Sequence, residues 1–299
     1  MPHNDNKYRL ALLAALIGNA IWGFSFLFTR RALQVTPLPS VLLSMRFTLA
    51  FAIMSVMLAL GKASFRLKGK KIGSLLFLGI VEPLCFLLET YGILYTNATV
   101  AGVVMAVSPI VSILLAAIFL HEVPNRVQML FCLLPVAGVV LITVSGSDLG
   151  VVTPLGLALL LGNCVTAGAY KTVNRKSAQE FSAFERTYAV IGIAAVAFLV
   201  MAMVQLKGDV AAYLAPLGDA TYVTSLLVLS VFCSVVAYLL ANYGSGLMSV
   251  AKIATFGAIS TVCSTFAGVV LLKEPVSWLM LLGAALIVVG VWQVTRKGT

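Results

Sequence analysis

The sequence predicts an all-α integral membrane protein in which ten transmembrane helices form two inverted five-helix repeats. The first reason is composition, since 61% of the 299 residues are hydrophobic and 10% are charged, whereas soluble domains have about 25% charged residues. The second is a series of ten apolar runs, which have about the roughly 20 residues that a helix needs to cross a bilayer. The third is an internal repeat with a period of about half the chain.

The ten expected spans are joined by short connections, so neighbouring helices are expected to be antiparallel. A β-barrel is disfavoured because barrel strands alternate apolar and polar residues over about ten positions. The first run lacks a small-residue cleavage site and is followed by Arg30-Arg31, so we interpret it as a retained helix and not as a signal peptide. In chain order the expected spans are residues 10–27, 41–60, 72–95, 98–120, 127–144, 152–170, 188–204, 221–243, 248–272 and 276–294.

The internal repeat is clearest around Tyr91-Gly92, which recurs as Tyr243-Gly244 after a shift of 152 positions. The same shift takes Gly138 to Gly290 without a gap. Solenoid repeats have periods of roughly 20 to 50 residues. The much longer period therefore indicates that half of the chain is duplicated.

Lysine and arginine orient the spans, because positively charged loops are retained in the cytoplasm. With the N-terminus inside, fourteen of these residues fall in inner loops and termini, and four fall in outer loops: Arg30, Arg31, Lys207 and Lys273. The net charge of +10 is therefore interpreted as a topology signal, and no nucleic-acid partner is expected. Both termini are expected in the cytoplasm.

Five spans per half make the repeat inverted, because the second copy then enters the membrane from the opposite side. We expect one half at residues 1–148 and the other at 149–299, within a single membrane domain. Inverted repeats are typical of alternating-access transporters, whose site lies near the bilayer midplane between the halves. The inversion also places Glu122 at the inner surface and Glu274 at the outer one, where we expect helix-end or loop contacts.

Short elements of the first copy occur in the order and spacing of a known family. They are Trp22-Gly23, Arg46, Tyr91-Gly92, Pro109, Glu122 and Gly138. With them, nearly the whole chain resembles the EamA type of the drug/metabolite transporter superfamily. The second copy departs from the pattern, since Thr261 stands in place of Pro109 and Thr166-Ala167 in place of Trp22-Gly23.

The resemblance implies a ten-helix secondary carrier of the cell inner membrane that exports a small metabolite, an amino acid or a drug by alternating access. Such carriers are commonly taken to use the proton gradient or exchange, and both stay open here. A flippase for a lipid or a lipid-linked sugar is the alternative on the same fold. The expected partners are a small-molecule substrate and the lipid bilayer, while monomer and homodimer both stay open.

Polar side chains inside the expected spans are the candidate site residues. An ionisable group in hydrocarbon costs at least about 2.5 to 3.5 kcal/mol, so it usually faces a cavity or a partner. At about 1.5 Å per residue, Glu82 lies roughly 15 Å into the third span, at the midplane. Asn19 and Asn163 lie at a similar depth and at equivalent repeat positions. The asparagines are expected either to line the site or to hydrogen-bond between helices.

Glu82 is the leading candidate for coupling. Pro83 follows it and is expected to kink the helix, because proline lacks a backbone donor. One interpretation is a proton or cation site, and the other is a protonated glutamic acid that locks two helices together. The midplane position beside a kink favours the first.

Arg46 and Glu89 are expected to form an ion pair. Glu89 lies about 9 Å and Arg46 about 8 Å from the outer boundary, in two spans that form a hairpin. A purely structural pair, an outer gate that breaks during the cycle, and direct contact with the substrate all stay open.

Trp22, Tyr170 and Lys252 complete the candidate substrate-binding or coupling set. Trp22 lies about 18 Å into its span and is expected in a cavity wall. Tyr170 ends the sixth span with an aromatic ring and a polar tip. Lys252, one turn inside the ninth span, either attracts a substrate carboxylate or extends to the interface.

Enzymatic chemistry is not expected. The two histidines, His3 and His121, lie in a tail and at a span edge. The five cysteines lie in apolar runs without CxxC spacing, which is typical of buried packing. The sequence has no P-loop motif, so ATP-driven pumping by this chain is not expected. We predict no catalytic residue, no metal site and no cofactor.

Overall fold

The structure is a computed structural model that describes residues 5–105, 152–248 and 256–296, with scattered positions between 107 and 141. In these ranges the regular elements are helices and no strand occurs. The end of the predicted fourth span and most of the fifth lie outside the described residues.

The described helices correspond to predicted spans, except for a short helical segment between the seventh and eighth. A single helical stretch from residue 220 to 247 combines three labelled segments, because its winding widens to a π-helix in the middle and then returns to α. In chain order the elements are α1 (Asp5–Val35), α2 (Pro39–Ala59), α3 (Gly73–Leu94), α4 (Ala98–Met105), α8 (Pro154–Ser177), α9 (Ala183–Gln205), α10 (Val210–Leu214), η1 (Ala215–Gly218), α11 (Ala220–Leu227), η2 (Val228–Val236), α12 (Ala237–Leu247), α14 (Gly257–Phe266), η3 (Ala267–Leu271) and α15 (Trp278–Arg296).

Among the described residues, five helical stretches are long and apolar enough to cross a membrane: Lys7–Val35, Pro39–Ala59, Gly73–Leu94, Ala183–Gln205 and Ala220–Leu247. They correspond to the first, second, third, seventh and eighth predicted spans. The chain is therefore a multi-pass helical membrane protein. The count of ten spans stays a prediction.

Side-chain caps define where several helices begin. Pro154 starts α8, and the preceding Thr153 hydroxyl accepts a hydrogen bond from the amide of Gly156 at 3.1 Å. Ser182 and Glu185 form a reciprocal capping box at the start of α9, with bonds of 3.2 and 2.8 Å. Such boxes satisfy two amides that a helix start leaves unpaired.

Two predicted boundaries are wrong, because α1 and α8 extend beyond their apolar runs. Arg30 and Arg31 lie within α1, and Lys171 lies within α8, although all three were assigned to loops. The Nη1 of Arg30 donates to the carbonyl of Ile93 at 3.2 Å, near the end of α3. Hydropathy marks where apolar residues stop, whereas a helix continues as long as its charged residues find partners.

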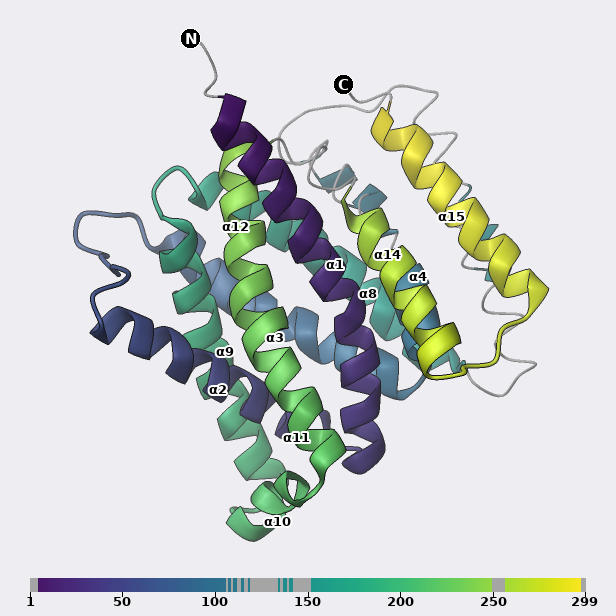
Figure 1. Cartoon of the computed structure of the whole chain (residues 1–299), viewed down its shortest axis with the longest axis horizontal. Coiled ribbons are helices and arrows are strands. Elements are labelled where there is room, and N and C mark those ends of the chain that lie inside the picture. The colour runs from purple at the N-terminus through teal and green to yellow at the C-terminus, as the bar shows by residue number, and fades with distance from the viewer. Residues whose placement is uncertain are drawn as a thin grey trace.

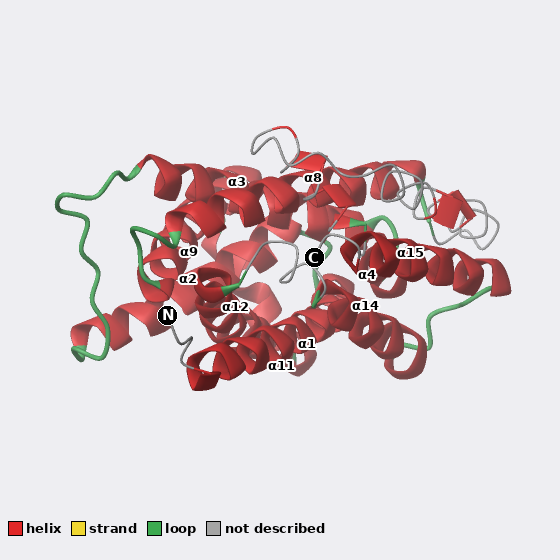
Figure 2. Ribbon diagram, turned by 90° about the horizontal axis from the view of Figure 1, so that it is seen from above, coloured by secondary structure: helices red, strands yellow, loops and turns green. Residues whose placement is uncertain are grey.

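The helices pair between the two predicted halves. Helix α3 packs along α8 and α1 packs along α12, while α2 contacts α9 and α4 contacts α14. Figure 2, which looks down on the bundle, shows α3 and α8 on one side and α1 with α12 and α14 on the other. If each helix is replaced by its counterpart in the other repeat, the pair of α3 with α8 becomes the pair of α1 with α12. The pairs of α2 with α9 and of α4 with α14 stay the same. A duplicated chain would give this pairing.

Close contact between the helices depends on small residues. A Cβ atom on Gly23 would lie 2.5 Å from Cβ of Cys263 and 2.7 Å from the carbonyl oxygen of Ser260. Only glycine therefore lets α1 approach α14 at this level. The beginning of α1 and the end of α15 lie at the same end of the bundle (Figure 1).

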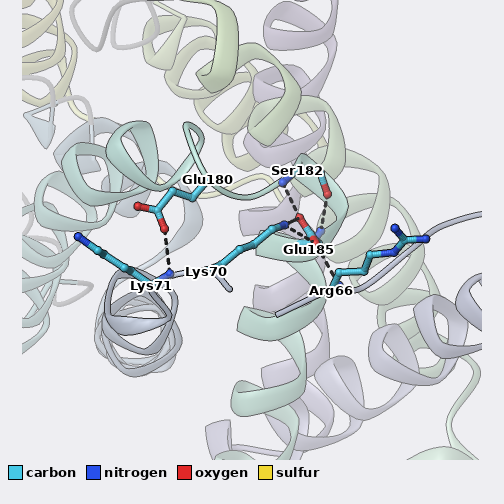
Figure 3. Close-up of polar contacts among 6 residues, drawn as sticks. All are labelled: Arg66, Lys70, Lys71, Glu180, Ser182 and Glu185. Carbon is cyan, nitrogen blue, oxygen red and sulfur yellow. Dashed lines mark hydrogen bonds and ion pairs between the residues drawn. The ribbon is translucent and has the colours of Figure 1, made fainter. Parts of the chain in front are cut away.

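A charged loop of the first predicted half binds the second (Figure 3). Between α2 and α3, the ammonium of Lys70 lies 2.7 Å from both carboxylate oxygens of Glu185. The backbone amide of Arg66 donates to the same carboxylate at 3.0 Å, and that of Lys71 donates to Glu180 at 3.1 Å. The basic run predicted as a topology signal thus also attaches its loop to the start of α9.

Candidate functional site

A cavity of about 180 Å³ lies between the paired helices. Its wall is built by α1, α2, α3 and α4 from the first predicted half and by α8, α12 and α14 from the second. Seven of the eight candidate residues line it: Asn19, Trp22, Arg46, Glu82, Glu89, Asn163 and Tyr170. The eighth, Lys252, lies outside the described residues.

Helix α1 contributes Asn19 and Trp22. The Asn19 amide donates to the carbonyl of Ala15 within the same helix at 2.8 Å. The indole of Trp22 donates to the carbonyl of Cys233 at 3.0 Å and meets the ring of Tyr238 edge to face, with centroids 5.2 Å apart. Cys233 belongs to the π-helical segment η2, whose wider turn changes which carbonyls are paired within the helix. Trp22 therefore joins α1 to this irregular segment.

Helix α3 contributes both glutamates. Glu82 is 6% exposed, and its polar neighbour is the thiol of Cys85, about one turn along the helix. Glu89 lies two turns beyond Glu82 on the same face and accepts a hydrogen bond from the Asn163 amide at 3.3 Å. Helix α3 runs unbroken from Gly73 to Leu94 with Pro83 inside it.

Helix α2 contributes Arg46, which is 2% exposed. Its Nε donates to the hydroxyl of Ser234 at 2.8 Å. The guanidinium carbon lies 4.7 Å from the ring centroid of Phe86 and 5.4 Å from that of Phe47. Arg46 and Glu89 interact electrostatically, but within the described part of the chain they form no ion pair of 4.0 Å or less. Their predicted pairing stays a prediction.

Helix α8 contributes Asn163, Tyr170 and a residue that sequence reasoning missed. Among the described residues, Asn163 Oδ1 and the Tyr170 hydroxyl are buried without a hydrogen bond of standard geometry, and the hydroxyl interacts with the side chain of Asn242. Lys171 also lines the cavity, and its ammonium donates to the hydroxyl of Ser108 at 2.9 Å. Asn163 and Asn19 both line the cavity, and each hydrogen-bonds elsewhere and not to the other.

A second missed group closes the end of the cavity where α8 and α12 finish. Arg186, which was assigned to an inner loop, is 2% exposed at the start of α9. Its Nη1 donates to Oδ1 of Asn174 at 2.7 Å and to Ser245 at 2.9 Å, and its Nη2 donates to the carbonyl of Asn242 at 2.6 Å. Asn174, Asn242 and Ser245 themselves line the cavity. Hydropathy gives no signal for this group, because Arg186 and Asn174 lie outside the apolar runs and meet Asn242 only in the fold.

Of the described residues, four with charged side chains thus face one cavity, with Arg46 and Lys171 as the cations and Glu82 and Glu89 as the anions. Glu82 interacts electrostatically with the other three. The wall between the charged groups is apolar and is formed by the aromatic rings of Trp22, Phe86, Tyr170 and Tyr238. Such a cavity binds small molecules with both charged and apolar parts. No group of three or more metal-ligating side chains occurs among the described residues.

A helical membrane protein with a charged cavity between paired helices has the architecture of a membrane transporter. Comparison with known families supports this class, because the model of the EamA-like transporter family matches the chain twice, at residues 9–144 and 154–296. The chain therefore belongs to the EamA-like transporter family. The resemblance seen in the sequence is confirmed.

Two individual relatives are named as transporters. The chain is 34% identical over 285 residues to an uncharacterized transporter, YcxC, of Bacillus subtilis (strain 168), with 94% of this chain and 91% of the relative covered. An uncharacterized transporter of Archaeoglobus fulgidus is 25% identical over 280 residues, with 92% and 95% covered. A solved crystal structure has a TM-score of 0.65 at 18% identity and covers 96% of this chain and 97% of its own. That last likeness concerns the fold alone.

Proposed function

We propose that this chain is a secondary carrier that exports a small metabolite, an amino acid or a drug across the cell inner membrane by alternating access. The two units that move are the five-helix halves at residues 1–148 and 149–299, and both termini face the cytoplasm. The observation that carries the proposal is the cavity itself, since both halves contribute charged side chains to its wall.

The size of the cavity favours a small metabolite. Pockets for drug-sized ligands have roughly 300 to 1,000 Å³, whereas this cavity has about 180 Å³ in the described conformation. The mixture of two carboxylates, two cations and several aromatic rings suits a substrate with charged and apolar parts, such as an amino acid.

Glu82 is the proposed coupling residue. It is buried against the cavity, and its carboxylate receives no N–H or O–H hydrogen bond from the described residues. A carboxylate in this position gains most from taking up a proton or from binding a donor group, because an unpaired charge in a membrane interior is costly. Binding of protons and of substrate would thus be linked at one side chain.

Reconstitution into liposomes tests the proposal. Wild-type protein and Glu82→Gln are compared for uptake of a labelled panel of metabolites, amino acids and drugs, with and without a pH gradient. We expect transport above protein-free liposomes that responds to the gradient, and we expect Glu82→Gln to lose this response.

Two results would contradict the account at different points. No transport of any panel member would remove the carrier proposal. Full transport by Glu82→Gln with unchanged pH dependence would remove Glu82 from the coupling role. A strict requirement for a specific lipid would favour the flippase alternative.

A further inference from the structure

We propose that Arg46 and Lys171 form an anion-binding subsite that recognises the carboxylate of the substrate, an inference that rests on the proposed carrier function. The starting observation is that both cations face the cavity without a close ion pair among the described residues, although Glu82 and Glu89 line the same cavity. In the described part of the chain, neither has a carboxylate oxygen within 4.0 Å.

The donors of Arg46 are only partly used. A guanidinium has five N–H donors, and the described contacts of Arg46 use one of them, from Nε to Ser234 at 2.8 Å. The rings of Phe86 and Phe47 lie against the group and hold it in place. Its two Nη groups therefore have hydrogen bonds to offer. A guanidinium can bind a carboxylate through two parallel hydrogen bonds.

Lys171 is in a similar position on the facing helix α8. Its ammonium has three N–H donors, and the described contact uses one of them, to Ser108 at 2.9 Å. Lys171 follows Tyr170, whose hydroxyl is buried without a hydrogen bond of standard geometry among the described residues. Glu82 interacts electrostatically with both Arg46 and Lys171, and all three side chains line the same cavity.

The cavity carboxylates and Arg46 differ in whether a proton can neutralise them, and this difference explains why the cavity needs an anion from the ligand. Each cavity carboxylate can be neutralised by a proton, whereas arginine stays charged at any pH that a cell reaches. Glu89 in addition has the Asn163 amide as a donor at 3.3 Å. Arg46 has no such route, and a buried charge without a close ionic partner is costly. A ligand carboxylate supplies the partner that the described residues do not.

An oxyanion could come from a soluble metabolite or from a lipid headgroup. We assign it to a small soluble carboxylate, because the cavity of about 180 Å³ is small compared with a lipid. From the sequence, Lys252 either attracts a substrate carboxylate or extends to the interface, and it lies outside the described residues. We assign a carboxylate-binding role to Lys171, which lies on the cavity wall.

Ligand binding to the full chain in phosphatidylcholine nanodiscs tests the subsite. The probes are phenylacetate with phenylacetamide, and propionate with propionamide, together with phenethylammonium as a cation of similar shape. In at least one pair we expect the carboxylate to bind about tenfold more tightly than its amide, because charge-assisted hydrogen bonds are roughly twice as strong as neutral ones.

Variants assign the preference to the two side chains. Arg46→Gln and Lys171→Gln should each reduce the carboxylate-to-amide ratio about tenfold, and Lys171→Arg should retain it. Lys176→Gln is the matched control, since Lys176 lies on the same helix and is exposed. If Arg46→Gln fails to fold, Lys171→Gln, Lys171→Arg and Lys176→Gln still show whether the carboxylate preference depends on Lys171.

Three results would overturn the subsite: equal binding of every carboxylate and its amide, tighter binding of phenethylammonium, or an unchanged ratio in Lys171→Gln. In nanodiscs with phosphatidylglycerol, loss of carboxylate binding would show that a lipid headgroup takes the site and would overturn the assignment to a soluble ligand. A carboxylate preference without transport in liposomes would refute the carrier function and support the subsite. Transport without a carboxylate preference would support the carrier function and refute the subsite.

Discussion

At the scale of single residues, the cavity side chains differ in whether their polar atoms already have hydrogen bonds within the protein. Trp22 and Asn19 donate to backbone carbonyls at 3.0 and 2.8 Å. Asn163 Oδ1 and the Tyr170 hydroxyl have no hydrogen bond of standard geometry among the described residues. Since buried polar atoms are nearly always hydrogen-bonded, the unsatisfied ones are the atoms most suited to meet a substrate.

The pairing of Arg46 with Glu89 is the residue-scale prediction. If the two charges meet in another state of the cycle, Arg46→Glu and Glu89→Arg should each destabilise the protein by about 3 to 5 kcal/mol, because each leaves a buried charge unpaired. The double exchange should recover part of that loss. Thermal unfolding of all four proteins in detergent measures it.

Failure of the double variant to recover any stability would count against the pair. Recovery of stability without recovery of transport would favour a gate or a substrate contact over a purely structural pair. Full recovery is not expected, because the exchange also removes the contact of Arg46 with Ser234 and with the two phenylalanine rings.

At the scale of elements, helix ends carry contacts between the two predicted halves. The carboxylate of Glu274, in the connection between η3 and α15, accepts hydrogen bonds from the amides of Ala98 and Thr99 at 3.0 and 2.9 Å and from the Thr99 hydroxyl at 2.6 Å. This is the helix-end contact that the repeat predicted. A carboxylate at a helix start satisfies free amides and complements the helix dipole.

Glu274→Gln should therefore lower stability by about 1 kcal/mol, since the amide keeps one acceptor but loses the charge. Glu180→Gln is the matched control, because Glu180 is exposed and accepts a single bond from a loop amide. Urea unfolding in detergent compares the two. Equal losses in both variants would contradict a capping role for Glu274.

The basic loop before α3 gives a second prediction at this scale. Lys70 is 28% exposed in its pair with Glu185, so Lys70→Met should cost less than about 1 kcal/mol. Glu185→Ala should cost more, about 1 to 2 kcal/mol, because it also removes the capping box of α9. The reverse order in thermal unfolding would show that the ion pair, and not the cap, attaches the loop.

The limits of sequence reasoning appear most clearly at α8. Asn163 and Glu82 could be found because a polar group inside an apolar run is costly and therefore has a reason to be there. Lys171 and Asn174 could not, since they follow the end of the run, where hydropathy does not distinguish a loop from a continuing helix. Arg186 was missed for a different reason, because its burial depends on contacts with Asn174 and Asn242 from other parts of the chain.

At the scale of the whole molecule, the repeat was readable because Tyr91-Gly92 recurs without a gap as Tyr243-Gly244. Which helices pair was not readable, since α3 against α8 and α1 against α12 are contacts between distant parts of the chain. The same pairing builds the cavity from both halves. Alternating access follows if those halves rotate against each other around it.

Accessibility of the cavity from each side tests this central claim most directly. Ala241 lines the cavity on α12 and carries no charge or hydrogen bond from its side chain. In a variant with all five cysteines replaced by serine, Ala241→Cys would be labelled with a membrane-impermeant maleimide in right-side-out and in inside-out vesicles. The account predicts labelling from both sides, with a transported substrate changing the balance between them. Labelling from one side only, under every substrate and pH condition tested, would contradict it.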